Sequence, residues 1–201
     1  MFKHLLIVCL VSMTATARAE SSILVFGDSL SAGYGLAVDQ SWPSLLSRRL
    51  AAAHVDYTVA NASISGETTA GGRARLPAAL RQFKPGVVIL ALGANDGLRG
   101  LPLAPMRDNL IAMIAAAKAQ RARVLLVGMK LPPNYGPDYD RQFEQSFRVV
   151  ATAQKVALLP FLLAPIASDP AAFQADGLHP TAAAQARILD HVWPALKPLL
   201  R

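Results

Sequence analysis

The segment 87–92, Val-Val-Ile-Leu-Ala-Leu, is apolar at every position and begins with three β-branched residues. A strand with one face in solvent alternates apolar and polar residues, whereas a strand without polar positions is covered on both faces. Strands of this kind occur in parallel sheets, because the helices that connect parallel strands lie on both sides of the sheet. This one segment therefore predicts an α/β fold with a central parallel sheet.

Strand-like and helix-like segments alternate along the rest of the chain, without an internal repeat, a low-complexity tract or a linker. Further strands are expected at residues 23–26, 55–60, 124–127 and 156–159, and helices at 41–53, 68–83, 105–120, 138–155 and 181–193. The alternation predicts a three-layer α/β/α sandwich on a five-stranded parallel sheet.

The first 19 residues have the pattern of a secretory signal peptide. Lys3 supplies a basic start, an apolar stretch covers residues 5–13, and Ala17-Arg18-Ala19 matches the small-residue cleavage motif. The apolar stretch is shorter than the ~18 to 20 residues of a membrane span, which disfavours a membrane anchor. We therefore expect cleavage after Ala19, a single domain over residues 20–201, and a periplasmic or secreted protein.

The composition limits how such an exported domain is stabilised and what it binds. The only cysteine, Cys9, lies in the leader, so the remaining chain has no disulfide and depends on its hydrophobic core. The formal net charge of +7 includes two leader residues, Lys3 and Arg18. The other basic residues are scattered and lack interleaved aromatic residues, which argues against a nucleic-acid partner. A weak attraction to anionic membrane surfaces stays open.

Polar residues follow two of the predicted strands. In parallel sheets, ligands bind beyond the carboxyl ends of the strands. Ser29 follows the first strand in Gly27-Asp28-Ser29, and Asn95 follows the strand at 87–92. Each has an ordinary structural explanation when taken alone, because serine caps helices and Asn-Asp-Gly sequences form turns. A hydroxyl and an amide donor at one edge of the sheet nevertheless suggest a shared cleft.

A carboxylate and an imidazole stand three residues apart just before the last predicted helix. In a tight turn, Asp176 can reach one ring nitrogen of His179 and leave the other nitrogen free. Pro180 is expected at the first position of the following helix. An aspartate that orients a histidine, which in turn accepts a proton from a serine, is the arrangement that activates a weak nucleophile.

These segments resemble the four sequence blocks of the GDSL, or SGNH, hydrolase family. The blocks occur in the usual order and span nearly all of residues 20–201: Gly27-Asp28-Ser29-Leu30, Gly66, Gly93-x-Asn95-Asp96 and Asp176-x-x-His179-Pro180. The segments 27–34 and 131–136 are similar to periplasmic bacterial members with thioesterase, lysophospholipase and arylesterase activity.

The resemblance implies a flavodoxin-like sheet and a role for each matching residue. Ser29 would be the nucleophile, His179 the general base and acid, and Asp176 its orienting partner. The backbone N–H groups of Ser29 and Gly66 and the side chain of Asn95 would form the oxyanion hole. Asp28 is interpreted as a carboxylate that stabilises the turn.

Signatures of other chemistries are missing from the sequence. Residues 27–31 read GDSLS, not the G-x-S-x-G elbow, and the chain has no P-loop or H-E-x-x-H sequence. Gly33-Tyr34-Gly35 is not followed by the third glycine of a dinucleotide fingerprint. His54 and His191 have no partners at metal-ligand spacing. We therefore expect neither a metal nor an organic cofactor.

The sequence thus predicts an exported, monomeric serine esterase for small-molecule or lipid acyl esters and thioesters: aryl esters, lysophospholipids and acyl-CoA-type thioesters. Apolar loop residues at the carboxyl edge are expected to form an acyl groove: Ile64, Leu98, Leu101, Pro133 and Tyr135. Two alternatives stay open. A carbohydrate O-deacetylase would use the same triad but should have more polar loops, and a catalytically silent lipid-binding protein would use only the fold.

Overall fold

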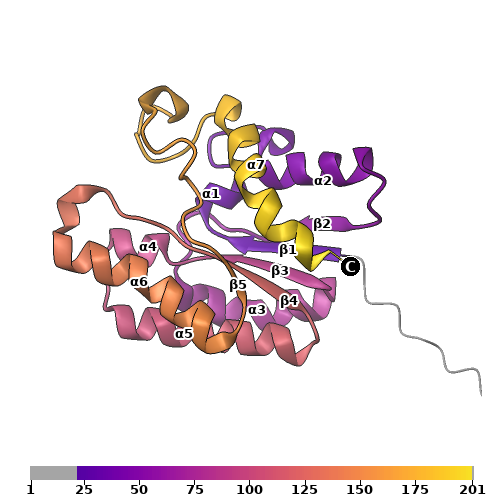
Figure 1. The fold of residues 1–201 in the computed structure, drawn as a ribbon, viewed down its shortest axis with the longest axis horizontal. Helices are drawn as coiled ribbons and strands as arrows, with labels where there is room; N and C mark the ends of the chain where they lie inside the picture. Colours follow the sequence, from indigo (N-terminus) through magenta and orange to yellow (C-terminus); the bar gives the residue numbers. More distant parts are fainter. Residues whose placement is uncertain (1–21, 201) are drawn as a thin grey trace, which may run out of the picture.

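The computed structural model describes residues 22–200, so the predicted signal peptide at residues 1–19 lies outside the described residues. Five strands form one parallel sheet in the order β2-β1-β3-β4-β5 (Figure 1). They are β1 (Ser22–Gly27), β2 (Thr58–Asn61), β3 (Val87–Ala91), β4 (Arg123–Val127) and β5 (Ala157–Leu159). This is the flavodoxin-like strand order, and the predicted fold class is confirmed.

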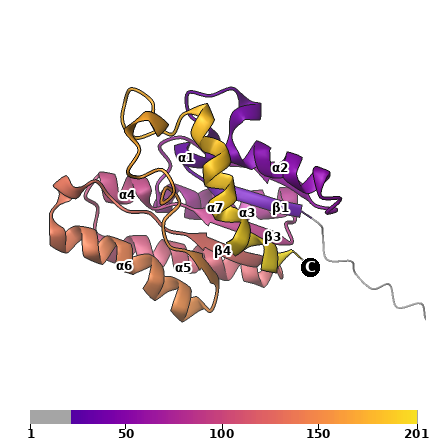
Figure 2. The same cartoon turned by 45° about the horizontal axis from the view of Figure 1, so that its top comes forward.

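Helices cover both faces of the sheet (Figures 1 and 2). Side chains of α2 (Trp42–Ala52) and α7 (Gln185–Leu196) share one core cluster with Ile23, Val25 and Ile89. Side chains of α3 (Thr69–Phe83), α5 (Leu103–Ala119) and α6 (Pro137–Gln154) share the other with Leu24, Phe26 and Val88. Consecutive strand residues thus face opposite layers, which explains why the central strand β3 contains no polar position.

The structure corrects several predicted boundaries. Strand β2 begins at Thr58 rather than at residue 55, because the N–H of Val55 still donates to the carbonyl of Leu50 at the end of α2. The prediction that Pro180 begins a helix is wrong. Pro180 forms a bridge with Phe173, and the last helical region begins with a 3-10 turn at Ala182–Ala184.

Two short helices, α1 (Ser29–Ala32) and α4 (Ala94–Leu98), were not predicted, because four or five residues are too few to show helical periodicity. They follow β1 and β3, the adjacent strands from which the chain continues to opposite sides of the sheet. A crevice opens at such a switch point and is the usual ligand site of this architecture. The fold therefore places Ser29 and Asn95 at its most favourable binding position.

No helix within residues 22–200 is both long and apolar enough to cross a membrane.

Candidate active site

Ser29 is the first residue of α1, and one residue, Asp28, separates it from the end of β1. Asp28 is the N-cap of this helix, and its Oδ1 accepts a hydrogen bond from the N–H of Leu30 at 3.1 Å. Gly27 is required at the end of β1, because a Cβ there would lie 2.9 Å from the carbonyl oxygen of Ala91. The close approach of β1 and β3 thus fixes the turn that presents the Ser29 hydroxyl.

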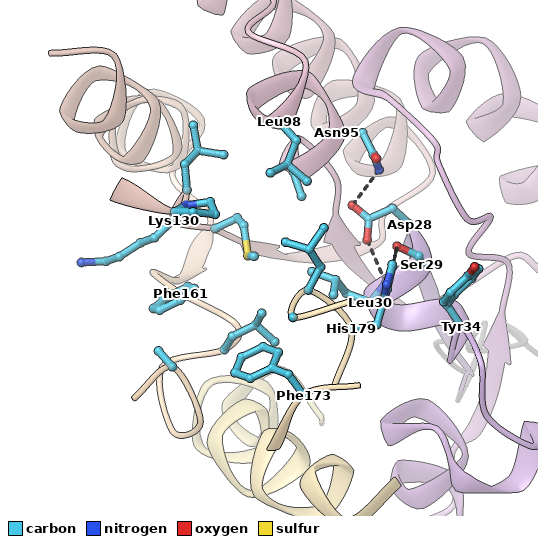
Figure 3. A pocket seen from close by; sticks show the side chains of 18 of the residues that line it. Asp28, Ser29, Leu30, Tyr34, Asn95, Leu98, Lys130, Phe161, Phe173 and His179 are labelled. Carbon is cyan, nitrogen blue, oxygen red and sulfur yellow. Dashed lines mark hydrogen bonds between the residues drawn. The ribbon is translucent and has the colours of Figure 1, made fainter. Parts of the chain in front are cut away.

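The ring of His179 links Ser29 to Asp176. Its Nε2 lies 2.8 Å from Oγ of Ser29, and its Nδ1 lies 2.7 Å from Oδ2 of Asp176 (Figure 3 shows Ser29 and His179). The other carboxylate oxygen of Asp176 accepts the N–H groups of Leu178 and His179 at 2.9 and 3.0 Å. The hydrogen bonds from the backbone and ring of His179 lower the pKa of Asp176 to about 2. Asp176 is therefore ionised over the whole neutral range and holds the ring in one orientation.

Gln174 fastens the loop that carries His179, and the sequence analysis did not single it out. Its N–H donates to the carbonyl of His179 at 2.7 Å. Its side-chain Nε2 donates to the carbonyls of Pro180 and Tyr34 at 3.0 and 2.8 Å. The loop before α7 is thereby tied to the loop that follows Ser29, although the two are separated by 140 positions.

Asn95 lies in α4, and its amide is held by the loop after β2. Nδ2 donates to the carbonyl of Glu67 at 2.9 Å and lies 3.5 Å from Oδ2 of Asp28 (Figure 3). Gly66 has a φ of +78°, and its carbonyl accepts a hydrogen bond from Arg99 at 3.0 Å. The structure thus brings Ser29, Gly66 and Asn95 to the same cavity.

Asp96 joins the two segments that carry Gly66 and Asn95. It is buried, and it accepts hydrogen bonds from the N–H and the hydroxyl of Thr69 at 2.8 and 2.5 Å. Asn109 donates to the same hydroxyl at 3.2 Å. Sequence reasoning treated Asp96 only as part of a family block. Its contact with Thr69, 27 positions away, cannot be recognised from the sequence.

Asp28 is a second buried carboxylate at the site, with an exposed fraction of 2%. Burial raises the pKa of Asp28 to about 6, and the hydrogen bond from Leu30 together with the charge of His179 opposes this rise. The predicted turn-stabilising role of Asp28 is confirmed by the hydrogen bond from Leu30. Its charge beside the amide of Asn95 was not foreseen.

A cavity of about 800 Å³ begins at Ser29, Asn95 and His179 and continues between apolar side chains (Figure 3). Most of its apolar lining comes from segments that follow three strands: Leu98, Met129, Leu131 and Pro132 follow β3 and β4, and Phe161, Leu163, Ala167, Pro170, Phe173 and Leu178 follow β5. A site with a few polar groups at one end of an apolar cavity suits a substrate with one reactive polar group and a hydrocarbon part.

Most of the groove residues named from the sequence lie elsewhere. Leu98 lines the cavity, whereas Ile64, Leu101 and Tyr135 do not, which corrects the sequence analysis. Ile64 and Leu101 are 48% and 38% exposed, and Tyr135 donates its hydroxyl proton to the carbonyl of Leu98 at 3.0 Å. The side chain of Pro133 lies outside the described part of the chain. The loop after β5 forms much of the wall instead, and its residues Leu162, Leu163 and Ile166 share a core cluster with α7.

The two other histidines of residues 22–200 do not line the cavity. His54 is exposed, and Nε2 of His191 lies 3.0 Å from the carbonyl oxygen of Phe161. Within the described residues, no three His, Cys, Asp or Glu side chains are grouped so that they could hold a metal ion.

Comparison with known proteins identifies the family. A family model described as GDSL-like lipase/acylhydrolase matches residues 25–187. The chain belongs to this family. This GDSL-like hydrolase is 51% identical over 191 residues to the esterase TesA of Pseudomonas aeruginosa, with coverage of 95% of this chain and 94% of the relative. It is 43% identical to an arylesterase of Vibrio mimicus, with 96% of each chain covered.

A further relative of the hydrolase is the Escherichia coli protein named thioesterase 1/protease 1/lysophospholipase L1. The two are 40% identical over 98% of this chain and 93% of the relative. A crystal structure of TesA superposes with a TM-score of 0.87 at 52% identity, covering 89% of this chain and 99% of that one. The hydrolase is thus an enzyme that acts on ester bonds, as the sequence predicted.

A second solved structure is that of the esterase EstA from Pseudoalteromonas, described as inhibited by monoethylphosphonate. It superposes with a TM-score of 0.86 at 40% identity over 90% of this chain and 99% of that one.

Proposed function

We propose that this hydrolase is an exported serine esterase that cleaves acyl esters and thioesters through an acyl-serine intermediate. The observation that carries the proposal is the continuous chain of contacts from Asp176 through His179 to Ser29, at 2.7 and 2.8 Å, at the polar end of an apolar cavity. A serine bonded to a histidine that is oriented by a carboxylate has the geometry needed for nucleophilic catalysis.

In the proposed first step, Oγ of Ser29 attacks the acyl carbon while its proton passes to Nε2 of His179. Asp176 stabilises the imidazolium that forms and keeps Nδ1 protonated. Collapse of the tetrahedral intermediate breaks the bond to the leaving oxygen or sulfur, which takes the proton from Nε2. A water molecule then attacks the acyl-serine, again with His179 as base and then acid.

The charge on the carbonyl oxygen requires donors that are already in place. The amide of Asn95 has two N–H groups, and one of them is used by the carbonyl of Glu67 at 2.9 Å. The contact with Asp28 at 3.5 Å is long, so the second N–H is available to a substrate oxygen. We propose that it acts together with the backbone N–H groups of Ser29 and Gly66 as the oxyanion hole.

The apolar cavity supports a fatty acyl chain as the group transferred to Ser29. Names of relatives add aryl esters, lysophospholipids and thioesters to the proposed substrates. The apolar lining disfavours the carbohydrate O-deacetylase, which would need polar loops around the sugar. The bonded Ser29–His179 pair disfavours a silent lipid-binding protein, which has no use for an activated hydroxyl.

The test is Ser29→Ala, assayed on p-nitrophenyl esters of increasing acyl length. We expect the variant to lose activity on every ester and to lose the mass shift that a phosphonate inhibitor adds to the wild-type protein. Ser31→Ala is the matched control, because its hydroxyl lies on the same helix and is buried without a hydrogen-bond partner among residues 22–200. Retained activity in Ser29→Ala contradicts the proposal.

Export is tested separately by N-terminal sequencing of the protein released from the periplasm. We expect Glu20 as the first residue, because the cleavage motif ends at Ala19. We also propose a monomer, which size-exclusion chromatography with light scattering checks.

A further inference from the structure

Tyr34 is an exposed aromatic residue placed beside the histidine of the site. The ring centroids of Tyr34 and His179 are 4.3 Å apart, and their planes are inclined by 33°. Tyr34 lines the cavity, yet it is 51% exposed. In Figure 3, Tyr34 lies on the opposite side of His179 from Phe161 and Lys130.

The main chain, not burial of the ring, fixes Tyr34 in this position. Its N–H donates to the carbonyl of Ser29 at 3.2 Å, and its carbonyl accepts from Nε2 of Gln174 at 2.8 Å. It stands between Gly33 and Gly35, whose φ values of +78° and +73° favour glycine. A Cβ on Gly35 would lie 2.3 Å from Oε1 of Gln174, so the loop passes close to this clamp.

His179 is already oriented without help from the Tyr34 ring. Asp176 accepts both its Nδ1–H and its backbone N–H, at 2.7 and 3.0 Å. Gln174 donates to its carbonyl at 2.7 Å. The ring of Tyr34 lines the cavity and is about half exposed, so it presents aromatic surface to the cavity beside the His179 ring.

The chemistry of acyl transfer indicates which part of the substrate would lie beside Tyr34. The leaving oxygen must come within about 3 Å of the nitrogen that protonates it. We place a substituent on that oxygen beside the His179 ring, and the acyl chain against the apolar part of the cavity lining, which includes Leu98 and Phe173. Aromatic rings attract each other at centroid distances of about 4.5–7 Å, which an aryl group beside His179 reaches from Tyr34.

We propose that Tyr34 binds the leaving group and is a specificity-determining residue that favours esters with a planar aromatic leaving group. The proposal rests on the proposed function, because a leaving group exists only where Ser29 and His179 carry out acyl transfer. In this arrangement, the acyl group and the leaving group are selected by different walls of one cavity.

The experiment compares three butyrate esters: benzyl, cyclohexylmethyl and ethyl. Benzyl and cyclohexylmethyl groups are similar in size, but only the first is planar, and all three esters form the same acyl-enzyme. Tyr34→Leu keeps apolar bulk without the ring, and Tyr34→Phe keeps the ring. Val38→Ala is the control, because Val38 is 85% exposed and does not line the cavity. Active enzyme is counted by titration with a phosphonate.

We expect Tyr34→Leu to lower kcat/KM for the benzyl ester, relative to the ethyl ester, by about two- to tenfold, which is the usual strength of an aromatic pair. The cyclohexylmethyl ester should lose less, and Tyr34→Phe and Val38→Ala should behave as the wild type. Tyr34→Gln gives the same comparison if the leucine variant folds poorly.

An equal loss on all three esters overturns the proposal, because it means that Tyr34 acts by positioning His179. No change on any ester overturns it as well. Failure of the proposed function is recognised separately, since Ser29→Ala would then still hydrolyse all three esters.

Discussion

The carboxylate of Asp28 lies 3.5 Å from the amide nitrogen of Asn95 and is buried in the interior of the site. Burial removes water from this carboxylate, and the hydrogen bond from the N–H of Leu30 and the charge of His179 offset part of that cost. A negative charge at this place has consequences both for stability and for the amide of Asn95.

The first prediction concerns the pH dependence of stability. The pKa of Asp28 rises from 3.8 to about 6 on folding, so the folded state disfavours the ionised carboxylate. The free energy of unfolding of the wild type, relative to Asp28→Asn, should therefore fall as the pH rises from 4 to 7 and then stay constant. The change should be on the order of 2–3 kcal/mol.

Urea unfolding of both proteins at pH 4.5 and pH 8 measures this difference. Asparagine is a suitable replacement, because it caps helix N-termini about as well as aspartate. A difference in unfolding free energy that is the same at both pH values would show that burial does not raise the pKa of Asp28.

The second prediction concerns the amide of Asn95. Asn95→Ala should lower kcat by about 10² to 10³, because it removes a donor to the charged oxygen of the transition state. KM should change little, since the donor gains most of its strength when the charge develops. Steady-state kinetics on p-nitrophenyl butyrate give both constants. A rise in KM with unchanged kcat would instead make Asn95 a binding residue.

The third prediction concerns the orienting carboxylate. Asp176→Asn keeps the shape of the side chain but removes the charge that fixes the tautomer of His179. We expect kcat at pH 7.5 to fall by up to about 10⁴, as in other triads. The melting temperature at that pH and phosphonate titration show whether the protein is folded and whether Ser29 can still be labelled. Wild-type kinetics in a folded Asp176→Asn variant would remove Asp176 from the mechanism.

The lowered pKa of Asp176 also makes a prediction for acid unfolding. Because the pKa is about 2 in the folded state and 3.8 without its partners, ionised Asp176 stabilises the fold above pH 4. This contribution is lost as the pH falls from 4 towards 2. The difference in unfolding free energy between the wild type and Asp176→Asn should shrink over this window, as measured by denaturant titration. A constant difference would contradict the assigned cause.

The last prediction separates the groove that the structure shows from the one expected from the sequence. Leu98→Ala should lower kcat/KM for decanoyl esters by about tenfold and leave acetyl esters nearly unchanged, because only a long chain buries surface against Leu98. Ile64→Ala is the matched control, since Ile64 is outside the cavity and should have no chain-length effect. An equal loss of kcat/KM in both variants would show that the acyl chain does not bind against Leu98.

The sequence by itself determined those features of the protein that depend on residues close together in the chain. The apolar segment 87–92 required a strand covered on both faces, and this predicted the parallel sheet. The spacing of Asp176 and His179 is also local, because a carboxylate can bond a ring three residues away in one tight turn. The position of Ser29 after the first strand followed from the same sheet, since all parallel strands end at one edge.

Only the tertiary structure decided which of these groups meet. Ser29 and His179 are 150 positions apart, and their contact depends on how Gln174 ties the last loop to the loop at Tyr34. The prediction for Pro180 was wrong for the same reason, because its pairing with Phe173 is a contact between two parts of that loop. The acyl groove could not be predicted from loop composition either. An apolar loop residue faces a cavity or solvent according to the path of the backbone, and that path is set by packing between elements distant in the sequence.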